Sequence, residues 1–304
     1  MTWWRAVALL MLGWSAWFCT STLKTVHTSK NAPPSEKALL WKISGNGLKK
    51  PSYLLGTIHL IPKEDFQITE GTRKALDEVR QIAFEINLQE MSGVGLFKVM
   101  TKTFMSGGKT LRDLLPEEDY AFVREQVARR TVMPMATLER MKPMFIGSLL
   151  ESEGTGLSAN GRMTSVEMEL FQLARKRRLA SDGLETIEYQ LSLFDSIPYA
   201  LQARILVEQL RQQSNAGEEF ARMVALYRQK DIQAMEAMTQ ESLRDEPLVQ
   251  ETLIYRRNRD WIPVMTRMMR EKPTFFAVGA GHLGGAQGVI ALLRKEGFRV
   301  EAVE

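Results

Sequence analysis

The C-terminal stretch TFFAVGAGHLGGAQGVIALLRKEGFRVEAV, residues 274–303, is the clearest structural unit of the sequence. It opens with an apolar run at 274–278, which is typical of a buried strand. A glycine-rich turn leads into an amphipathic helix at 286–296, which Gly297 ends, and residues 298–303 alternate as a second strand. A strand, a helix and a strand in this order predict a sheet with a parallel element.

Further strands lie upstream of this unit. Residues 38–44 and 52–56 form a predicted hairpin around Gly45-Asn46-Gly47, a turn sequence that favours positive φ. The apolar run at 81–84 and the short segment at 179–182 are two more candidate strands.

Helical patterns fill most of the remaining chain, from about residue 92 to 176 and from 188 to 270. The predicted fold class is therefore α/β, with a mixed central sheet, flanking helices and a large helical insertion.

The N-terminus differs from the rest of the chain. Arg5 precedes an uncharged apolar run that extends to about residue 23, which is typical of a secretory signal and close to the length of a membrane span. We expect a signal peptide or N-terminal membrane anchor at 1–23, a linker at 24–37 and one domain at 38–304. The domain is then periplasmic or otherwise extracytoplasmic, and it stays at the membrane if the N-terminal segment is retained.

Composition narrows the chemistry. The net charge is +4, and the 40 basic and 36 acidic residues are interspersed, so no nucleic-acid partner is expected. The only cysteine is Cys19, within the predicted signal, which leaves the domain without a disulfide or a thiolate metal site.

Two of the three histidines each follow a glycine by three residues, at the end of a predicted strand. They are His59, in Gly56-Thr57-Ile58-His59, and His282, in Gly279-Ala280-Gly281-His282, whereas His27 falls in the linker. We expect the glycine to let the chain turn sharply as it leaves the sheet. Ligands of open α/β sheets bind beyond the carboxyl ends of the strands, where both histidines are predicted to lie.

Two acids share this predicted location, Glu85 after the strand at 81–84 and Glu185 after the strand at 179–182. Taken singly, each such residue is more often a hydrogen-bonded core histidine or a surface acid. Four of them at strand ends favour a site for Mn²⁺, Zn²⁺ or Co²⁺, which could activate water to hydrolyse an amide or ester. Arg257 is either surface charge or a cation that reaches these acids and stabilises developing negative charge.

A competing interpretation concerns the same C-terminal turn. Residues 279–284 match the dinucleotide fingerprint G-x-G-x-x-G, with Glu301 about 20 residues further on. No further strands follow this unit in the sequence to complete the usual sheet order, so the metal interpretation is preferred.

The motifs also resemble those of the TraB/GumN family, which is similar to the animal Tiki metalloproteases and, more distantly, to erythromycin-esterase-like and ChaN-like proteins. The resemblance covers about residues 38–304 and rests on the following segments: Tyr53–His59, Phe84-Glu85, Gly183-Leu184-Glu185-Thr186 with Gln190, Arg257-Asn258, and Ala277–Leu283. It implies a single α/β domain with a helical insertion and a divalent-metal-dependent peptidase. It assigns metal binding to His59, His282, Glu85 and Glu185, and catalytic roles to Glu85 and Arg257.

Two positions depart from the family pattern. Arg256 stands where the family usually has glutamate, which reverses the charge, and Glu167 stands where it usually has aspartate, which preserves it. The resulting hypothesis is a metal-dependent hydrolase that acts on a peptide or protein. The alternative is a non-catalytic protein of the same type that sequesters a peptide or another ligand.

Overall fold

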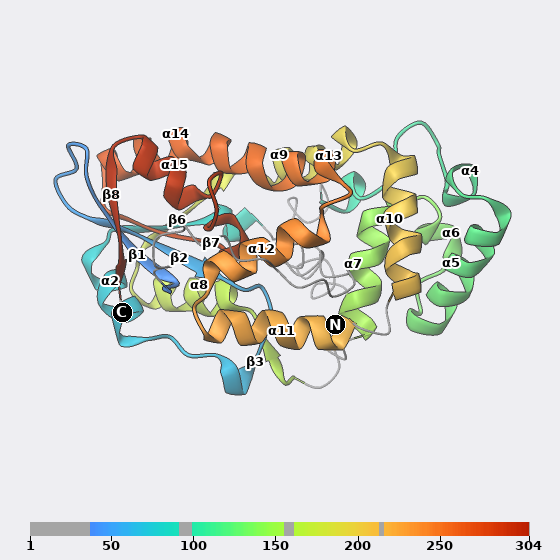
Figure 1. Cartoon of the computed structure of the whole chain (residues 1–304), viewed down its shortest axis with the longest axis horizontal. Helices are drawn as coiled ribbons and strands as arrows, with labels where there is room; N and C mark the ends of the chain where they lie inside the picture. The colour runs from blue at the N-terminus through green and yellow to red at the C-terminus, as the bar shows by residue number, and fades with distance from the viewer. Residues whose placement is uncertain (1–36, 91–98, 155–160, 213–215, 304) are drawn as a thin grey trace, which may run out of the picture.

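The computed structural model describes residues 37–90, 99–154, 161–212 and 216–303 (Figure 1). The predicted signal or anchor at 1–23 and all but the last residue of the predicted linker lie outside the described residues. Across the described ranges, no helix is both long enough and apolar enough to cross a membrane.

A six-stranded sheet forms the centre of the domain, in the order β6-β4-β7-β2-β1-β8. Strands β6, β4, β7 and β2 are mutually parallel, whereas β1 is antiparallel to both of its neighbours. The predicted mixed α/β sheet is therefore confirmed. The strands are β1 (Leu40–Gly45), β2 (Ser52–Thr57), β4 (Gln81–Ile86), β6 (Ala180–Glu185), β7 (Thr274–Gly279) and β8 (Phe298–Val303), and a separate two-stranded sheet pairs β3 (Ile61–Pro62) with β5 (Met163–Thr164).

Strand β8 runs in the same direction as β7 but lies at the far edge of the sheet, beyond β2 and β1. Both sides of β7 are already paired, one with β2 and the other with β4. The helix between them, α15 (Val289–Lys295), is shorter than the predicted 286–296. The turn before α15 is tight: a Cβ on Gly288 would lie only 2.1 Å from the carbonyl oxygen of Gly284.

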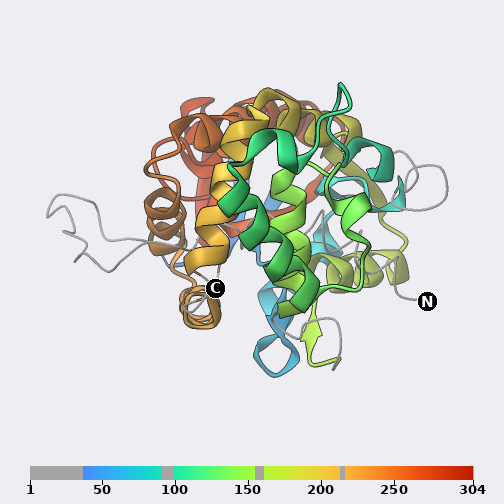
Figure 2. The same ribbon diagram turned by 90° about the vertical axis from the view of Figure 1, so that its right-hand side faces the viewer.

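Helices cover both faces of the sheet, and a group of helices continues the domain beyond one end of the sheet (Figures 1 and 2). The α-helices are α2 (Glu70–Glu78), α4 (Leu111–Leu114), α5 (Glu117–Arg130), α6 (Met135–Leu138), α7 (Pro143–Gly154), α8 (Val166–Lys176), α9 (Ile187–Leu193), α10 (Tyr199–Gln212), α11 (Ala216–Arg228), α12 (Ile232–Ser242), α13 (Pro247–Gln250), α14 (Arg256–Glu271) and α15. Short 3-10 helices are η2 (Lys63–Asp65), η3 (Leu88–Glu90), η4 (Phe194–Ser196) and η7 (Ala280–His282), and the π-helix η6 (Glu251–Tyr255) leads into α14.

Alternate residues of the central strands pack into two separate cores, because successive side chains of a strand point to opposite faces of the sheet. On β7, Phe275 and Ala277 join the core that α2 and α8 cover, whereas Phe276 and Val278 join the core beneath α14 and α15. Met265, Met268 and Met269 of α14 are also buried in this second core, where they pack against the sheet.

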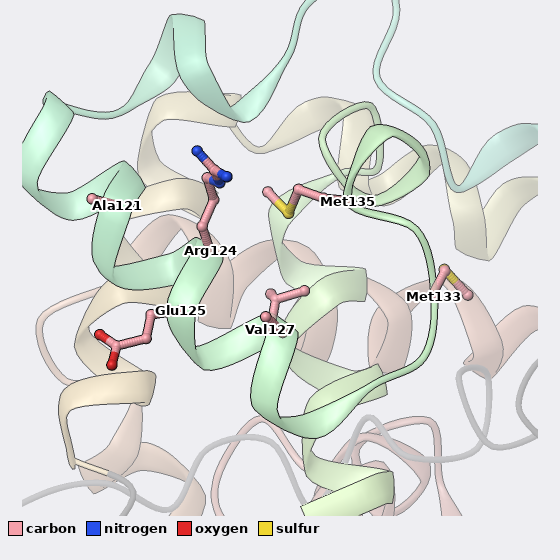
Figure 3. A pocket seen from close by; sticks show the side chains of 7 residues that line it. Ala121, Arg124, Glu125, Val127, Met133 and Met135 are labelled. Carbon is pink, nitrogen blue, oxygen red and sulfur yellow. The ribbon is translucent and has the colours of Figure 1, made fainter.

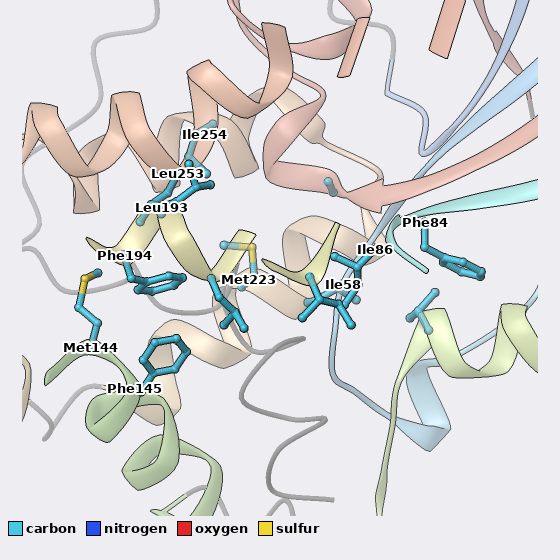
Figure 4. Close-up of a cluster of buried hydrophobic side chains, with 14 of the residues drawn as sticks. Ile58, Phe84, Ile86, Met144, Phe145, Leu193, Phe194, Met223, Leu253 and Ile254 are labelled. Carbon is cyan, nitrogen blue, oxygen red and sulfur yellow. The ribbon is translucent and has the colours of Figure 1, made fainter. Parts of the chain in front are cut away.

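The helical insertion continues the first core beyond the carboxyl ends of the strands. Figure 4 shows this apolar cluster running from Phe84 and Ile86 at the sheet to Met144, Phe145 and Phe194 in the insertion. The ends of the strands are therefore enclosed between the sheet and the insertion, so that side chains at this edge are withdrawn from water.

Candidate metal centre

The two Gly-x-x-His segments leave the sheet side by side, because β2 and β7 are parallel neighbours that pair Gly56 with Val278 and Thr57 with Gly279. A Cβ on Gly56 would lie 3.1 Å from the Cβ of Ala280, so glycine is needed here for the close approach of the second segment. The prediction that glycine is needed for a sharp turn is wrong for Gly279, because its φ of −51° is a value that any residue can adopt.

The two acids lie at the carboxyl ends of the next strands. Glu85 is within β4, which extends past the predicted end at residue 84 because Ile86 pairs with Glu185, the last residue of β6. Strand β4 lies between β6 and β7, and the three strands are parallel. Both acids therefore lie at the same edge of the sheet as His282, which follows the end of β7. The sequence-predicted residues are thus brought to one sheet edge.

Arg257 joins the acids into a buried ion network. Its Nη2 lies 2.6 Å from Oε2 of Glu85 and 2.6 Å from Oε1 of Glu185, and its Nε donates to the latter oxygen at 2.9 Å. Its Nη1 lies 3.4 Å from Nε2 of His282. The sequence leaves Arg257 open between surface charge and a cation at the acids, and the structure shows the second.

The two acids differ in their other partners. Glu185 uses both carboxylate oxygens, since Oε1 also accepts from Gln190 at 2.9 Å and Oε2 accepts from the indole of Trp261 at 3.0 Å. Glu85 accepts on Oε1 from the backbone N–H of Gly279 at 2.9 Å, and this oxygen lies 3.9 Å from Nε2 of His282. Glu85 is therefore the acid that faces a histidine.

Each histidine is held through Nδ1 by a buried partner from a helix. Nδ1 of His59 lies 2.7 Å from Oε1 of Glu167, at the start of α8. Nδ1 of His282 lies 2.6 Å from Oδ1 of Asn258, in the first turn of α14. The ring of His282 also packs on Trp261, with 4.7 Å between the ring centroids.

Electrostatics give the members of the site different charges. Burial favours the neutral form of Glu85, but Arg257 and the histidines outweigh it and hold the pKa of Glu85 below its usual range. Burial is the largest cause that lowers the pKa of His282, to about 3, and Arg257 and His59 add to it against the attraction of Glu85. At neutral pH the site therefore holds an ionised carboxylate beside a neutral imidazole.

His59 behaves in the opposite way. Burial acts to lower its pKa, but the paired carboxylate of Glu167 outweighs burial and raises the pKa of His59 above its ordinary value. Burial acts on Arg257 in the same direction, yet Glu185 and Glu85 raise the pKa of its guanidinium. Arg257 is a permanent cation in this site.

Sequence reasoning does not assign roles to Glu167, Asn258 or Trp261. In the sequence, Glu167 stands out only as a charge-preserving departure, and Asn258 only as the neighbour of Arg257 in a motif. Trp261 follows Arg257 by four residues, the spacing that places two side chains on one helix face, and both reach Glu185. That spacing is a usable signal.

The donor set is compatible with a divalent ion, although the side chains are not already gathered round one. Among the described residues, no three His, Cys, Asp or Glu side chains form a group that could hold a metal ion as they stand. Nε2 of His282 and Oε1 of Glu85 are 3.9 Å apart, however, a gap that two bonds of about 2.1 Å to a single ion would span. The two imidazoles and the carboxylate are ligand types suited to Zn²⁺ and Mn²⁺.

The geometry does not favour the dinucleotide fingerprint. The turn after β7 forms the 3-10 helix η7, and α15 begins only at Val289, so the glycines do not open a helix directly. The ring of His282 is 3% exposed and is turned into the acid and arginine network rather than away from it.

Among the cavities that the described residues line, two are of interest because of their position relative to the site. One of about 420 Å³ is on the insertion, between α5 and the segment before α6, and contains none of the predicted site residues (Figure 3). Another cavity, of about 330 Å³, lies beside β2 and the start of α8, and its lining includes Leu55, Val166 and Tyr227. Tyr227, which lines this cavity, donates from its hydroxyl to the carbonyl oxygen of Gly56 at 3.3 Å.

Comparison with known proteins identifies the family and distant relatives of the chain. The chain is 22% identical to metalloprotease TIKI1 of Danio rerio, over 97% of this chain and 71% of the relative. It is 23% identical to metalloprotease TIKI1 of Homo sapiens, over 96% of this chain and 70% of the relative, and 23% identical to metalloprotease TIKI2 of Xenopus tropicalis, over 88% and 61%. No solved structure matches the chain. A family profile described as TraB/PrgY/gumN matches residues 39–302, which is nearly the whole described domain, and the chain belongs to that family.

Proposed function

We propose that this chain is a metal-dependent hydrolase, and specifically a peptidase that acts on peptides or proteins outside the cytoplasm. The observation that carries the proposal is the convergence of His282, Glu85 and Arg257 at one enclosed sheet edge, to which the pairing of β2 with β7 also brings the segment of His59. The relatives named metalloproteases support the reaction class.

In this proposal, Nε2 of each histidine and Oε1 of Glu85 hold the ion. Metal ligation by Glu185, which the resemblance implied, is replaced by another role: its two oxygens hold Arg257 and Trp261 in place. Gln190, which donates to Glu185 at 2.9 Å and lies 3.5 Å from Glu85, keeps the two carboxylates apart and oriented.

A divalent ion bound here, Mn²⁺, Zn²⁺ or Co²⁺, would supply Lewis-acid activation of a carbonyl group and of water. Glu85 is ionised, so its carboxylate accepts the proton that the attacking water gives up. Nη1 of Arg257 points toward His282, and it donates to the negative charge that develops on the substrate oxygen.

The proposed location and partners rest on the sequence alone. The apolar segment at 1–23 supports export to the periplasm or beyond, with a membrane contact if the segment stays attached. The interspersed charges support a peptide or protein substrate rather than a nucleic acid.

Metal content of the purified domain is the first test. We expect one divalent ion per chain after loading with Mn²⁺, Zn²⁺ or Co²⁺, and none in the double variant His59→Ala/His282→Ala. If the wild type and the double variant bind the same amount under every loading condition, the proposed centre is wrong.

A mass-spectrometric screen on a peptide library is the second test. Glu85→Gln should abolish cleavage and weaken metal binding, because Glu85 serves as both ligand and proton acceptor. Cleavage lost with the metal fully retained would restrict Glu85 to the proton, and unchanged cleavage would contradict its role. The matched control is Glu169→Gln, since Glu169 is exposed on α8 and accepts a hydrogen bond from Thr164, away from the site.

The same screen separates the alternative of a sequestering protein. One observation favours that alternative, namely that Arg257 already pairs with both acids without any ion. It predicts peptide binding without cleavage after metal loading, and binding that survives in Glu85→Gln.

A further inference from the structure

The two histidines of the centre are backed by side chains of unequal charge. His59 meets the carboxylate of Glu167 and His282 meets the amide of Asn258, in both cases through Nδ1 at 2.6–2.7 Å. All four side chains are at most 6% exposed, so water does not compete for these contacts.

The chemistry of each partner fixes which ring nitrogen carries the proton. A carboxylate only accepts hydrogen bonds, so Nδ1 of His59 donates to Glu167. The amide nitrogen of Asn258 donates to the carbonyl oxygen of Gln287 at 2.8 Å, which leaves its Oδ1 to accept from Nδ1 of His282. A guanidinium only donates, so Nε2 of His282 faces Arg257 with a lone pair.

Glu167 is itself built into place. Its Oε1 also accepts from the hydroxyl of Thr57 at 2.7 Å, and its Oε2 accepts from the hydroxyl of Ser165 at 3.1 Å. Ser165 is the N-cap of α8, so the carboxylate lies in the first helical turn, where the helix dipole stabilises negative charge. Thr57 belongs to the same Gly-x-x-His segment as His59, and Glu167 therefore ties that segment to α8 at two points.

We infer that Glu167 and Asn258 are positioning residues that present Nε2 of both histidines to one shared ion, and that the charge of Glu167 makes His59 the stronger donor of the pair. The inference rests on the proposed metal centre. Carboxylate–histidine–metal arrangements raise the basicity of the ligand, and loss of such a partner typically weakens metal binding about 10–100-fold. An amide partner orients the ring without adding charge.

Glu167→Gln is the decisive variant, because it keeps the volume and the accepting oxygen but removes the charge. We expect its affinity for Co²⁺, measured by competition dialysis, to fall about 10–100-fold, with a shifted visible absorption spectrum of the bound Co²⁺. Glu169→Gln on the same helix should match the wild type in both measurements. Glu167→Asp restores the charge and should recover part of the affinity.

A second measurement needs no metal. In the metal-free wild type at alkaline pH, ¹⁵N chemical shifts of the imidazoles should show the proton of both histidines on Nδ1. Glu167→Ala should move the proton of His59 toward Nε2 and leave His282 unchanged.

The outcomes separate the two claims. If the wild type binds Co²⁺ and Glu167→Gln binds it equally well with the same spectrum, the positioning role is overturned and the metal centre stands. If the wild type binds no divalent ion, the proposed function fails, and the ¹⁵N shifts still decide whether Glu167 sets the ring of His59. A wild-type proton on Nε2 of either ring overturns the inference.

Discussion

Two buried cations occupy different regions of the molecule and differ in what surrounds them. Arg257, at the sheet edge, is 4% exposed, and its partners Glu85 and Glu185 are 14% and 4% exposed. Lys142, in the helical insertion, is 1% exposed, but Asp195, which lies 2.8 Å from its Nζ, is 42% exposed. Arg257 is enclosed in a cage of buried acids, so that loss of one member leaves a buried charge without its partner. Lys142 pairs with an acid that is exposed to solvent, so loss of the lysine leaves no buried charge behind.

The largest expected effect comes from breaking the cage. Arg257→Met leaves two carboxylates buried without a counter-charge, so the free energy of unfolding should fall by about 3–5 kcal/mol at neutral pH. Urea denaturation of the metal-free protein measures this loss. Adding Glu85→Gln and Glu185→Gln to Arg257→Met should restore part of the stability, and a loss below about 1 kcal/mol in the single variant would contradict the network.

A smaller effect should separate the two acids of the cage. Glu185→Gln removes the charge from an acceptor that Arg257, Gln190 and Trp261 share, which should reduce the free energy of unfolding by about 1.5–3 kcal/mol. Glu85→Gln should cost less, because Glu85 is more exposed and Arg257 donates to it through one nitrogen, against two for Glu185. Equal losses in the two variants would contradict the distinction between Glu185, which holds Arg257 in place, and Glu85, the proposed metal ligand.

The pH dependence of stability should have a slope of at most about 1.4 kcal/mol per pH unit for one proton. The folded pKa of His282 is depressed to about 3, below its ordinary value of about 6.5, so the unfolded chain binds more protons between these values. The contribution of His282 is therefore present above about pH 6.5 and is lost as the pH falls toward 3.

The variant His282→Gln isolates this effect. Its stability should depend less steeply on pH across the same window in metal-free buffer, measured by urea denaturation. His59 has a raised pKa, so its contribution has the opposite sign and is lost as the pH rises above the ordinary histidine range. Identical slopes in wild type and His282→Gln would show that His282 is not buried in its neutral form.

The smallest effect is expected in the insertion. In Lys142→Met the side chain stays buried, and Asp195 keeps its exposure to solvent and its hydrogen bond from Tyr199 at 2.9 Å. Replacement of a buried charge by an apolar group of similar length is often neutral, so the free energy of unfolding should change by less than about 1 kcal/mol. A loss as large as that of Arg257→Met would make the two buried cations equivalent.

The sequence predicted much of the sheet because strands are local patterns. The apolar run before Gly279 and the alternation at 298–303 both appear as strands, β7 and β8. The sheet order was not readable, because the choice of neighbour for β8 depends on β7 having both sides paired. The length of α15 was also missed, since close backbone contacts around Gly288 decide where that helix begins.

The site shows the same division. His59, His282, Glu85 and Glu185 could be predicted to lie at one edge because residues at the carboxyl ends of parallel strands meet there. Glu167 and Asn258 were not assigned, because each lies on a helix whose contact with a histidine is long-range, 108 residues apart for Glu167 and 24 for Asn258. No local pattern encodes such a pairing, and metal binding itself stays a prediction.

The sequence alone determined the α/β class, the pair of Gly-x-x-His segments and the family, since hydrophobic periods and short motifs are properties of neighbouring residues. The tertiary structure decided which acid faces a histidine, which acid holds Arg257, and which partner backs each imidazole. Those assignments depend on distances of 2.6–3.9 Å between residues from different strands and helices, and only the packed fold sets such distances.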